Sequence, residues 1–370
     1  MSSRLNVAYD YQIFGGQKYG GISRYFFELA NHISQLDDVS ASIVAPLYIN
    51  SYLNTSNSNL NIIGRKVPIF KGAWQFYRLY NALVSPSKIA MLAPDIVHET
   101  YYSDRDSRRG TARTVLTVYD MIHELFPKSF RNSDNTSALK LRAIKRADHV
   151  ICISKTTQQD LVNHLNISID KTSVIYLGVQ LERSKVCLKP IRKRPYLLYV
   201  GSRGGYKNFQ TTLEMYGTHS WVRDGYDLVF FGGGPLDANE RVLLNKLNLS
   251  DRQVRHETGG DAALVNLYEN AAVFIYPSFY EGFGIPPLEA MSCRCPVVSS
   301  NAGAMPEILG DAAEFFDPFS ASSMADAIER IVCNDQRKNT LIQLGLNRAA
   351  QFSWEKCAKD TLEVYQNLSP

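Results

Sequence analysis

Short runs of apolar, β-branched residues alternate with longer helical patterns along almost the whole 370-residue chain. Such alternation is typical of βαβ units, whose parallel strands are buried on both faces and therefore appear as continuous apolar runs. The pattern predicts an α/β protein with parallel sheets. The candidate strands are Leu5 to Tyr9, Ser42 to Ala45, Ile96 to His98, Val115 to Val118, Val150 to Ile153, Val174 to Tyr176, Tyr196 to Val200, Asp227 to Phe231, Val273 to Tyr276 and Pro296 to Ser299.

A change in composition near the middle of the chain predicts a domain boundary. The segment from Leu181 to Pro195 reads LERSKVCLKPIRKRP, which is rich in basic residues and proline and is typical of a linker. The chain length also favours about two domains. We therefore predict an N-terminal domain over 1–185 and a C-terminal domain over 190–353. Ser353 should cap a last helix over 354–370, which we expect to pack back on the N-terminal domain.

Composition excludes several classes of protein. Forty Lys and Arg against 36 Asp and Glu leave a net charge of +4, too mild to indicate a nucleic-acid partner. Six cysteines are scattered without a CxxC pair, which favours reduced thiols over disulfides or a metal centre. No segment resembles a signal peptide or reaches about 18 consecutive apolar residues. We expect a cytoplasmic protein without a membrane span.

One glycine-containing loop after the Val273 to Tyr276 strand is the strongest candidate for a binding site. The sequence EGFGIPPLEAM places two adjoining prolines at the beginning of a helix, directly after glycines that let the backbone approach a ligand closely. Free backbone N–H groups and the positive end of the helix dipole favour phosphate at such a position. The candidate ligand-binding residues of this loop are Gly282, Phe283, Gly284 and Ile285.

Two glutamates, Glu281 and Glu289, flank this loop. A carboxylate beside phosphates would repel them, so we expect these side chains to accept hydrogen bonds from pairs of hydroxyls, which ribose and hexoses both present. An alternative is that Glu289 is only an acidic residue in the first turn of a helix. That alternative leaves Glu281 and the loop unexplained.

The stretch PSFYEGFGIPPLEAMSCRCPVVSSNAGAMPEILGDAA resembles the donor-site signature of the retaining glycosyltransferases of family 4, also called glycosyltransferase group 1. The resemblance implies the GT-B architecture, in which two Rossmann-like domains with parallel sheets face each other across a cleft. It also implies a nucleotide-sugar donor, a catalytic role for Glu281 in orienting the transferred sugar, ribose binding by Glu289, and no metal cofactor.

Arg203 and Lys207 follow the Tyr196 to Val200 strand, within VGSRGGYKN. The resemblance places these two cations at the donor diphosphate. Negative charge grows on the leaving nucleoside diphosphate as the glycosidic bond breaks, so cations there would act chiefly in the transition state. The alternative is two solvated surface cations.

Two further motifs lie in the N-terminal half. Gly20 and Gly21 follow the first strand and resemble the family's glycine loop opposite the donor, although a plain strand-to-helix turn fits equally well. Asp120 and His123 lie at a position where relatives often carry His-Asp, but Tyr119 occupies the usual histidine place. Asp120 and His123 remain catalytic candidates on the acceptor side, and a structural histidine is the alternative.

Two charged clusters complete the candidates. Asp104-Arg105-Asp106 matches a DxD motif that in another glycosyltransferase fold holds a metal, but we predict none here because cations already provide counter-charge. Four cations gather on a predicted helix after Ser137, which has either a solvated face or a surface for a bilayer carrying a lipid-linked acceptor. They are Lys140, Arg142, Lys145 and Arg146.

Together these features predict a retaining hexosyltransferase that moves a sugar, first of all mannose from GDP-mannose, to a hydroxyl of a glycan or lipid-linked oligosaccharide. GGISRYFFELA, YKN and YEGFGIPPLEAM resemble transferases that build bacterial surface polysaccharides such as O-antigen, which implies peripheral association with the inner membrane. Two alternatives stay open. They are a nucleotide-sugar epimerase on the same fold and a catalytically inactive protein that binds sugar nucleotides.

Overall fold

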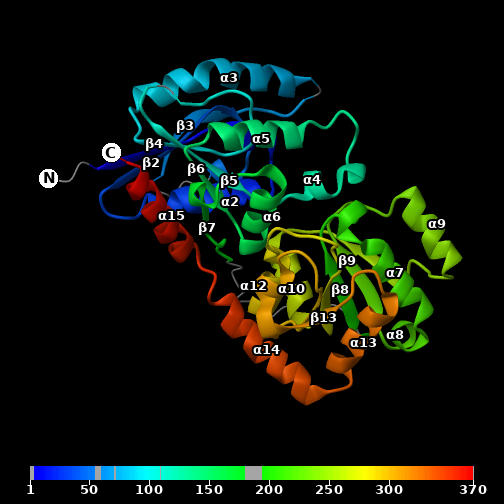
Figure 1. Ribbon diagram of the computed structural model, residues 1–370. Coiled ribbons are helices and arrows are strands. Elements are labelled where there is room, and N and C mark those ends of the chain that lie inside the picture. The colour runs from blue at the N-terminus through cyan, green and yellow to red at the C-terminus, as the bar shows by residue number, and fades with distance from the viewer. Residues whose placement is uncertain (1–3, 55–59, 71, 109, 180–193, 370) are drawn as a thin grey trace. The chain divides into compact units, whose positions relative to one another are not determined.

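The computed structural model describes residues 4–54, 60–70, 72–108, 110–179 and 194–369 (Figure 1). The chain divides into two compact units. Unit 1 comprises residues 1–124, 130–178 and 353–370, and unit 2 comprises residues 125–129 and 179–352. The predicted boundary between residues 185 and 190 lies outside the described residues.

Unit 1 is built on a parallel sheet of seven described strands in the order β3-β2-β1-β4-β5-β6-β7. The central strands are buried along most of their length, which explains their apolar sequences. The strands are β1 (Leu5–Tyr9), β2 (Val39–Tyr48), β3 (Asn61–Lys66), β4 (Ile96–Glu99), β5 (Arg113–Val118), β6 (His149–Cys152) and β7 (Thr172–Val174).

The helices of unit 1 connect and cover these strands (Figure 1). The longest of them, α3, packs against β2 and the short α1. The helices are α1 (Gln12–Gly16), α2 (Gly21–Ile33), α3 (Ala73–Met91), α4 (Ile122–Leu125), α5 (Thr136–Arg146), α6 (Lys155–Leu165) and α15 (Trp354–Leu368).

Unit 2 contains a parallel sheet of six described strands in the order β10-β9-β8-β11-β12-β13. Its strands are β8 (Tyr196–Val200), β9 (Asp227–Phe231), β10 (Val254–Glu257), β11 (Val273–Tyr276), β12 (Val297–Ser300) and β13 (Ala313–Phe316). Its helices are α7 (Phe209–Thr218), α8 (Ser220–Gly225), α9 (Ala238–Lys246), α10 (Asp261–Asn270), α11 (Ile285–Ser292), α12 (Met305–Leu309), α13 (Ala321–Val332) and α14 (Asp335–Ala349).

Both sheets have the doubly wound topology, which confirms the predicted α/β class and the two Rossmann-like domains. In each sheet the direction of winding reverses at one place, between β1 and β4 in unit 1 and between β8 and β11 in unit 2. Ligands of open α/β sheets bind beyond the carboxyl ends of the strands at such a reversal. The topology alone therefore directs attention to the loops after these four strands.

The C-terminal helix α15 contributes to the core of unit 1. Ser353 caps it as predicted, because the Ser353 hydroxyl accepts a hydrogen bond from the Lys356 amide at 3.1 Å. At the other end of the helix, the Tyr365 hydroxyl lies 2.6 Å from Nδ1 of His98 and 3.2 Å from the Tyr9 hydroxyl. Burial lowers the pKa of His98 to about 3, so this imidazole is neutral at physiological pH.

Candidate functional site

In unit 2, the loop between β11 and α11 forms the predicted helix start. Gly284 precedes the first helical residue with a φ of 98°, a left-handed conformation that glycine adopts without strain. Pro286 and Pro287 carry no backbone N–H, so the first donors at this end of α11 belong to Gly284 and Ile285. Phe283 is buried and makes an edge-on ring contact with Phe352 at 5.5 Å.

Two of the predicted donor-site residues, 74 positions apart in the chain, form an ion pair. Lys207 Nζ lies 2.6 Å from Oε1 of Glu281, which also accepts a hydrogen bond from the Ser278 hydroxyl at 2.6 Å. The Lys207 ammonium also lies 5.1 Å from the ring centre of Tyr206 and 5.8 Å from that of Tyr276. Lys207 is therefore anchored at the β8–β11 reversal and is not a freely solvated cation.

The backbone of Glu281 is held by the loop after β12. The Ala304 amide donates a hydrogen bond of 3.0 Å to the Glu281 carbonyl. Gly303, which precedes Ala304, has a φ of 58°. A Cβ atom at Gly303 would lie 2.7 Å from the backbone N and 2.8 Å from the backbone O of Glu281. Only glycine fits here without displacing the backbone that carries the carboxylate.

Glu289 lies in the second turn of α11 and is buried. The expectation that it could be a first-turn helix acid is wrong, because α11 begins at Ile285 and has no acidic residue in its first turn. Burial, and then the charge of the Glu289 carboxylate, raise the pKa of Tyr268 well above its ordinary value. The Glu289 side chain is thus largely shielded from bulk water.

Arg203 is bound to the protein through all its nitrogen atoms. Nε and Nη2 donate to the Glu240 carboxylate at 2.7 and 3.0 Å, and Nη1 and Nη2 donate to carbonyls of the loop after β9 at 2.8 to 3.1 Å. Those carbonyls belong to Gly232, Gly234 and Pro235. The side chain is only 5% exposed, so it is not a solvated surface cation. In this arrangement Arg203 holds together three segments at the carboxyl edge of the sheet.

In unit 1, the glycine pair begins α2. Gly20 precedes the helix in an extended conformation, and Gly21 is its first residue. Nothing lies within 4 Å of where a Cβ atom of Gly21 would be. A Cβ atom at Gly20 would instead lie 2.4 Å from Oε1 of Gln17, and neither glycine is required by positive φ.

Asp120, His123 and Tyr119 differ in their surroundings. Asp120 accepts a hydrogen bond from the Ile122 amide at 3.0 Å at the beginning of α4. His123 stacks on Phe130, with ring centres 3.9 Å apart, and burial followed by the charge of Lys140 lowers its pKa. The imidazole is therefore mainly neutral at pH 7. Tyr119 is buried among aromatic rings. Between Tyr119 and His123, only His123 has a partly exposed side chain.

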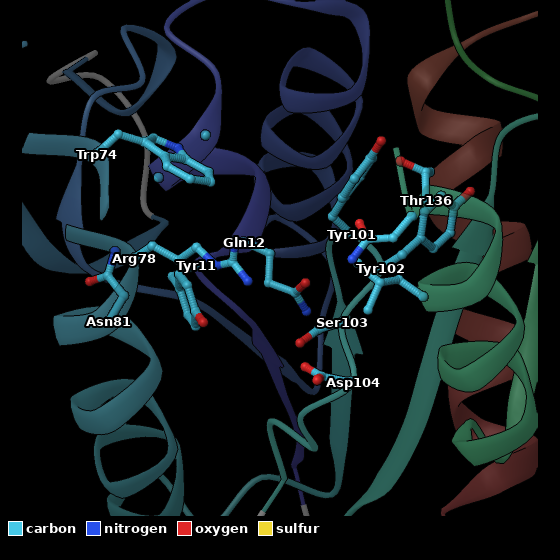
Figure 2. A pocket seen from close by; sticks show the side chains of 14 residues that line it. Tyr11, Gln12, Trp74, Arg78, Asn81, Tyr101, Tyr102, Ser103, Asp104 and Thr136 are labelled. Carbon is cyan, nitrogen blue, oxygen red and sulfur yellow. The ribbon is translucent and has the colours of Figure 1, made fainter. Parts of the chain in front are cut away.

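The loops at the β1–β4 reversal enclose a pocket of about 320 Å³ in unit 1. Figure 2 shows Trp74 and Arg78 of α3 on one side, Tyr101 and Thr136 on the other, and Gln12 between them. Aromatic and polar side chains thus line the pocket together, as in sites that bind amphipathic small molecules. The sequence interpretation missed this pocket, because its lining comes from four distant segments.

A buried carboxylate, that of Asp10, connects the ends of β1 and β4. Asp10, at the end of β1, accepts hydrogen bonds from the Thr100 amide at 2.9 Å, the Thr100 hydroxyl at 2.6 Å and the Ser107 hydroxyl at 2.7 Å. The two strand ends are therefore tied together. Nearby Glu99 pairs with Arg146 at 2.5 Å, and burial followed by the Asp10 charge raises the pKa of Glu99 to about 7. These acids carry no motif that would have singled them out in the sequence.

The predicted basic helix, α5, does not present four cations on one solvated face. Lys140 is buried and donates 2.7 Å to the Glu124 carboxylate and 2.8 Å to the Asp120 carbonyl. Arg146 is bound to Glu99 and to the Ser103 carbonyl. Only Arg142 and Lys145 are exposed. Two of the four cations are therefore internal and hold α5 against the sheet.

Across the described part of the chain, no three His, Cys, Asp or Glu side chains gather in an arrangement that could hold a metal ion. In the DxD segment, Asp106 is paired with Arg108 at 3.0 Å. The helices that the structure describes include none long and apolar enough to cross a bilayer.

Two family models match consecutive parts of this chain. The model described as Glycosyltransferase Family 4 matches residues 19–183, and the model described as Glycosyl transferases group 1 matches residues 184–348. O-antigen chain mannosyltransferase B of Escherichia coli is 26% identical over 369 residues, covering 94% of this chain and 96% of that protein. O-antigen chain mannosyltransferase RfbU of Salmonella typhimurium is 27% identical over 327 residues, covering 85% and 88%.

The fold agrees with these two matches. Sucrose-phosphate synthase from Thermosynechococcus elongatus superposes with a TM-score of 0.77 at 19% identity, covering 99% of both chains. With the two family models, this match defines the class of enzyme: a glycosyltransferase of the GT-B type. The chain belongs to the glycosyltransferases of family 4 and group 1, as the donor-site resemblance predicted.

Proposed function

We propose that this enzyme transfers mannose from GDP-mannose to a hydroxyl of a growing polysaccharide or lipid-linked oligosaccharide, as a step in O-antigen synthesis. The names of the Escherichia coli and Salmonella relatives support the sugar and the pathway. The observation that carries the proposal is the Lys207–Glu281 pair at the β8–β11 reversal, beside the start of α11. A cation, a buried carboxylate and a helix N-terminus there suit a sugar joined to a diphosphate.

Each donor-site residue then has a role of its own. Lys207 and the amides at the start of α11 stabilise the charge that grows on the departing diphosphate. Glu281 orients the hydroxyls of the transferred sugar, and Glu289 binds the ribose. Arg203 acts as a positioning residue that holds the loop of Gly232 to Pro235 at the edge of the same site. In unit 1, Gly20 and Gly21 at the start of α2 are the donor-binding residues that we propose for the N-terminal domain.

We further propose that the sugar is transferred with retention of configuration by front-face attack. In that route the leaving phosphate helps to take the proton of the acceptor hydroxyl, so no covalent nucleophile is needed. Glu281 is poorly suited to act as one, because Lys207 and Ser278 both bind its Oε1 atom. On the acceptor side, the mainly neutral His123 can accept a hydrogen bond from the attacking hydroxyl, and Asp120 orders the turn that carries it.

The pocket of unit 1 is the proposed acceptor site. Its aromatic rings offer apolar faces for the C–H faces of a sugar, while Gln12, Asp104 and Arg78 offer hydrogen-bonding groups for its hydroxyls. Because the acceptor is lipid-linked in this proposal, the enzyme would work at the cytoplasmic face of the inner membrane. The five cysteines among the described residues form no disulfide, which suits a reducing compartment.

A donor panel tests the proposal. Purified enzyme is incubated with GDP-mannose, UDP-glucose, dTDP-rhamnose or GDP-fucose and a panel of lipid-linked oligosaccharides, and the anomeric configuration of the product is determined by NMR. We expect GDP-mannose to give an α-linked product. Transfer from another donor would show that the transferred sugar is not mannose. A product with inverted configuration would exclude front-face attack. Donor turnover without acceptor would indicate an epimerase, and binding without transfer an inactive binding protein.

A further inference from the structure

The outer face of α3 is apolar although it faces solvent. Large exposed side chains repeat at helical spacing, so that they form one stripe along the helix. The opposite face, which includes Tyr77, Asn81 and Ile89, is buried, and the helix packs against β2. The stripe comprises Phe76, Leu79, Tyr80 and Leu83, with Ile69 and Phe70 just before the helix; Phe76 is 63% and Leu83 66% exposed.

This surface is far more apolar than a solvated helix requires. Singly exposed apolar residues are common, but a contiguous patch of this kind marks an interaction surface. Figure 1 shows α3 running along the margin of unit 1. The aromatic residues of the patch are of the types that concentrate at the boundary between water and hydrocarbon in membranes.

The segment of chain that contains α3 carries charge of a single sign. Between Asp38 and Asp95 the sequence contains no Asp or Glu, yet it contains five Lys or Arg. Of these, Arg65, Lys66 and Arg78 are exposed; Arg78 lies on the pocket side of α3, where its guanidinium is 5.4 Å from the ring centre of Trp74. Exposed aromatic and aliphatic side chains on a segment of chain that carries cations and no acids match an anionic lipid surface. A second copy of the same face would bring like charges together, so it is a poorer partner.

The same helix also lines the acceptor pocket proposed above. Trp74, Arg78 and Asn81 of α3 form part of its wall, while the residues of the stripe lie on the outer side. We propose that the outer face of α3, with Ile69 and Phe70, binds an anionic phospholipid bilayer and holds the mouth of this pocket at the lipid surface. Binding of lipid is independent of the proposed function, whereas delivery of a lipid-linked acceptor to the pocket rests on it.

Vesicle sedimentation tests the binding. The full-length chain is mixed with vesicles of phosphatidylcholine alone or of equal parts phosphatidylcholine and phosphatidylglycerol. We expect binding to the anionic vesicles that weakens at about 0.5 M salt. The variant Phe76→Ser/Leu79→Ser/Leu83→Ser should bind at least about tenfold more weakly, and Arg65→Gln/Lys66→Gln should lose the preference for anionic lipid. The matched control is Val242→Ser/Phe319→Ser, which replaces two exposed apolar residues of unit 2.

Each result separates the possibilities. The proposal would be overturned if the wild-type protein did not bind anionic vesicles, or if the triple variant bound them as tightly as wild type. So would dimerisation of the wild type that the triple variant abolishes, because α3 would then be an interface between two copies. If the triple variant transfers sugar to a water-soluble acceptor as well as wild type does, but transfers less to an acceptor in vesicles, that result would support the proposal. If wild type binds vesicles but transfers no sugar, the proposed function fails and lipid binding stands.

Discussion

Lys207 Nζ lies 2.6 Å from Oε1 of Glu281, and both side chains are mostly buried. The two residues therefore act as a pair, because removal of either one leaves a buried charge without its partner. We predict that Lys207→Met lowers kcat by at least about a hundredfold, since the charge on the leaving group loses its cation. It should also destabilise unit 2 by roughly 2 kcal/mol.

The double variant Lys207→Met/Glu281→Gln distinguishes the two effects. It removes the uncompensated carboxylate, so stability measured by urea unfolding should recover while kcat stays low. Recovery of both stability and turnover would mean that Lys207 serves only to neutralise Glu281.

Gly303 gives a way to move Glu281 without altering any group that touches a ligand. In Gly303→Ala, the new Cβ atom would have to occupy space 2.7 Å from the Glu281 nitrogen, so the loop must shift. We predict that donor affinity, measured by calorimetry with GDP-mannose, falls by about tenfold or more.

Gly110→Ala is the matched control for this experiment. Gly110 also has a positive φ, 81°, but nothing lies within 4 Å of where its Cβ would be. It should show the cost of backbone strain, about 1 kcal/mol, without a change in donor affinity. Equal donor affinities in the two variants would show that the Gly303 contact does not position Glu281.

Arg203 and Glu240 allow the positioning role to be tested by a double-mutant cycle. If Arg203 acts by holding the loop after β9, Glu240→Ala should weaken donor binding in the same direction as Arg203→Ala, and the two losses should not add. The loss should appear mainly in KM. Independent effects, with Arg203→Ala lowering mainly kcat, would instead indicate direct contact with the diphosphate.

Asp237→Ala controls for damage to α9 in this cycle. Asp237 and Glu240 form the capping box of α9, so Glu240→Ala also removes a helix cap. Asp237→Ala should remove a similar cap, at a cost of about 1 kcal/mol, while Arg203 keeps its ion pair with the Glu240 carboxylate.

His98 predicts how the stability of unit 1 depends on pH. Its pKa falls to about 3 in the folded protein, below the ordinary 6.5, so the unfolded chain binds more protons between these values. This contribution to stability is complete above about pH 6.5 and is lost as pH falls toward 3, at up to about 1.4 kcal/mol per pH unit. Urea unfolding of His98→Gln should show a drop between pH 7 and pH 5 smaller by roughly 2 kcal/mol. An identical drop in both proteins would contradict the assignment.

The sequence predicted the central strands better than the edges. Apolar runs marked β1, β8, β9 and β11, which are covered on both faces. The apolar pattern did not predict β3, β10 and β13, and all three lie at the edge of a sheet. An edge strand is buried on fewer sides, so polar and charged residues interrupt its pattern, as in the VRHE sequence of β10.

The donor-site residues were accessible from sequence because most of them lie in one continuous loop. The acceptor pocket was not, since only the β1–β4 reversal brings its distant segments together. Burial of Lys140 left a usable signal. It lies three, four and seven residues before Ala143, Ile144 and Ala147, so helical periodicity places it on the buried face.

The place of α15 has a consequence for how the protein assembles during synthesis. Every strand of unit 1 leaves the ribosome before the first strand of unit 2, but the hydroxyl that completes the Tyr9 and His98 hydrogen bonds comes from Tyr365. Unit 1 must therefore wait with an unfinished core while unit 2 is translated and folds. A nascent chain arrested at Phe352 would expose the α2 surface that α15 covers, and exposed apolar surface of this kind makes a folding intermediate prone to aggregate.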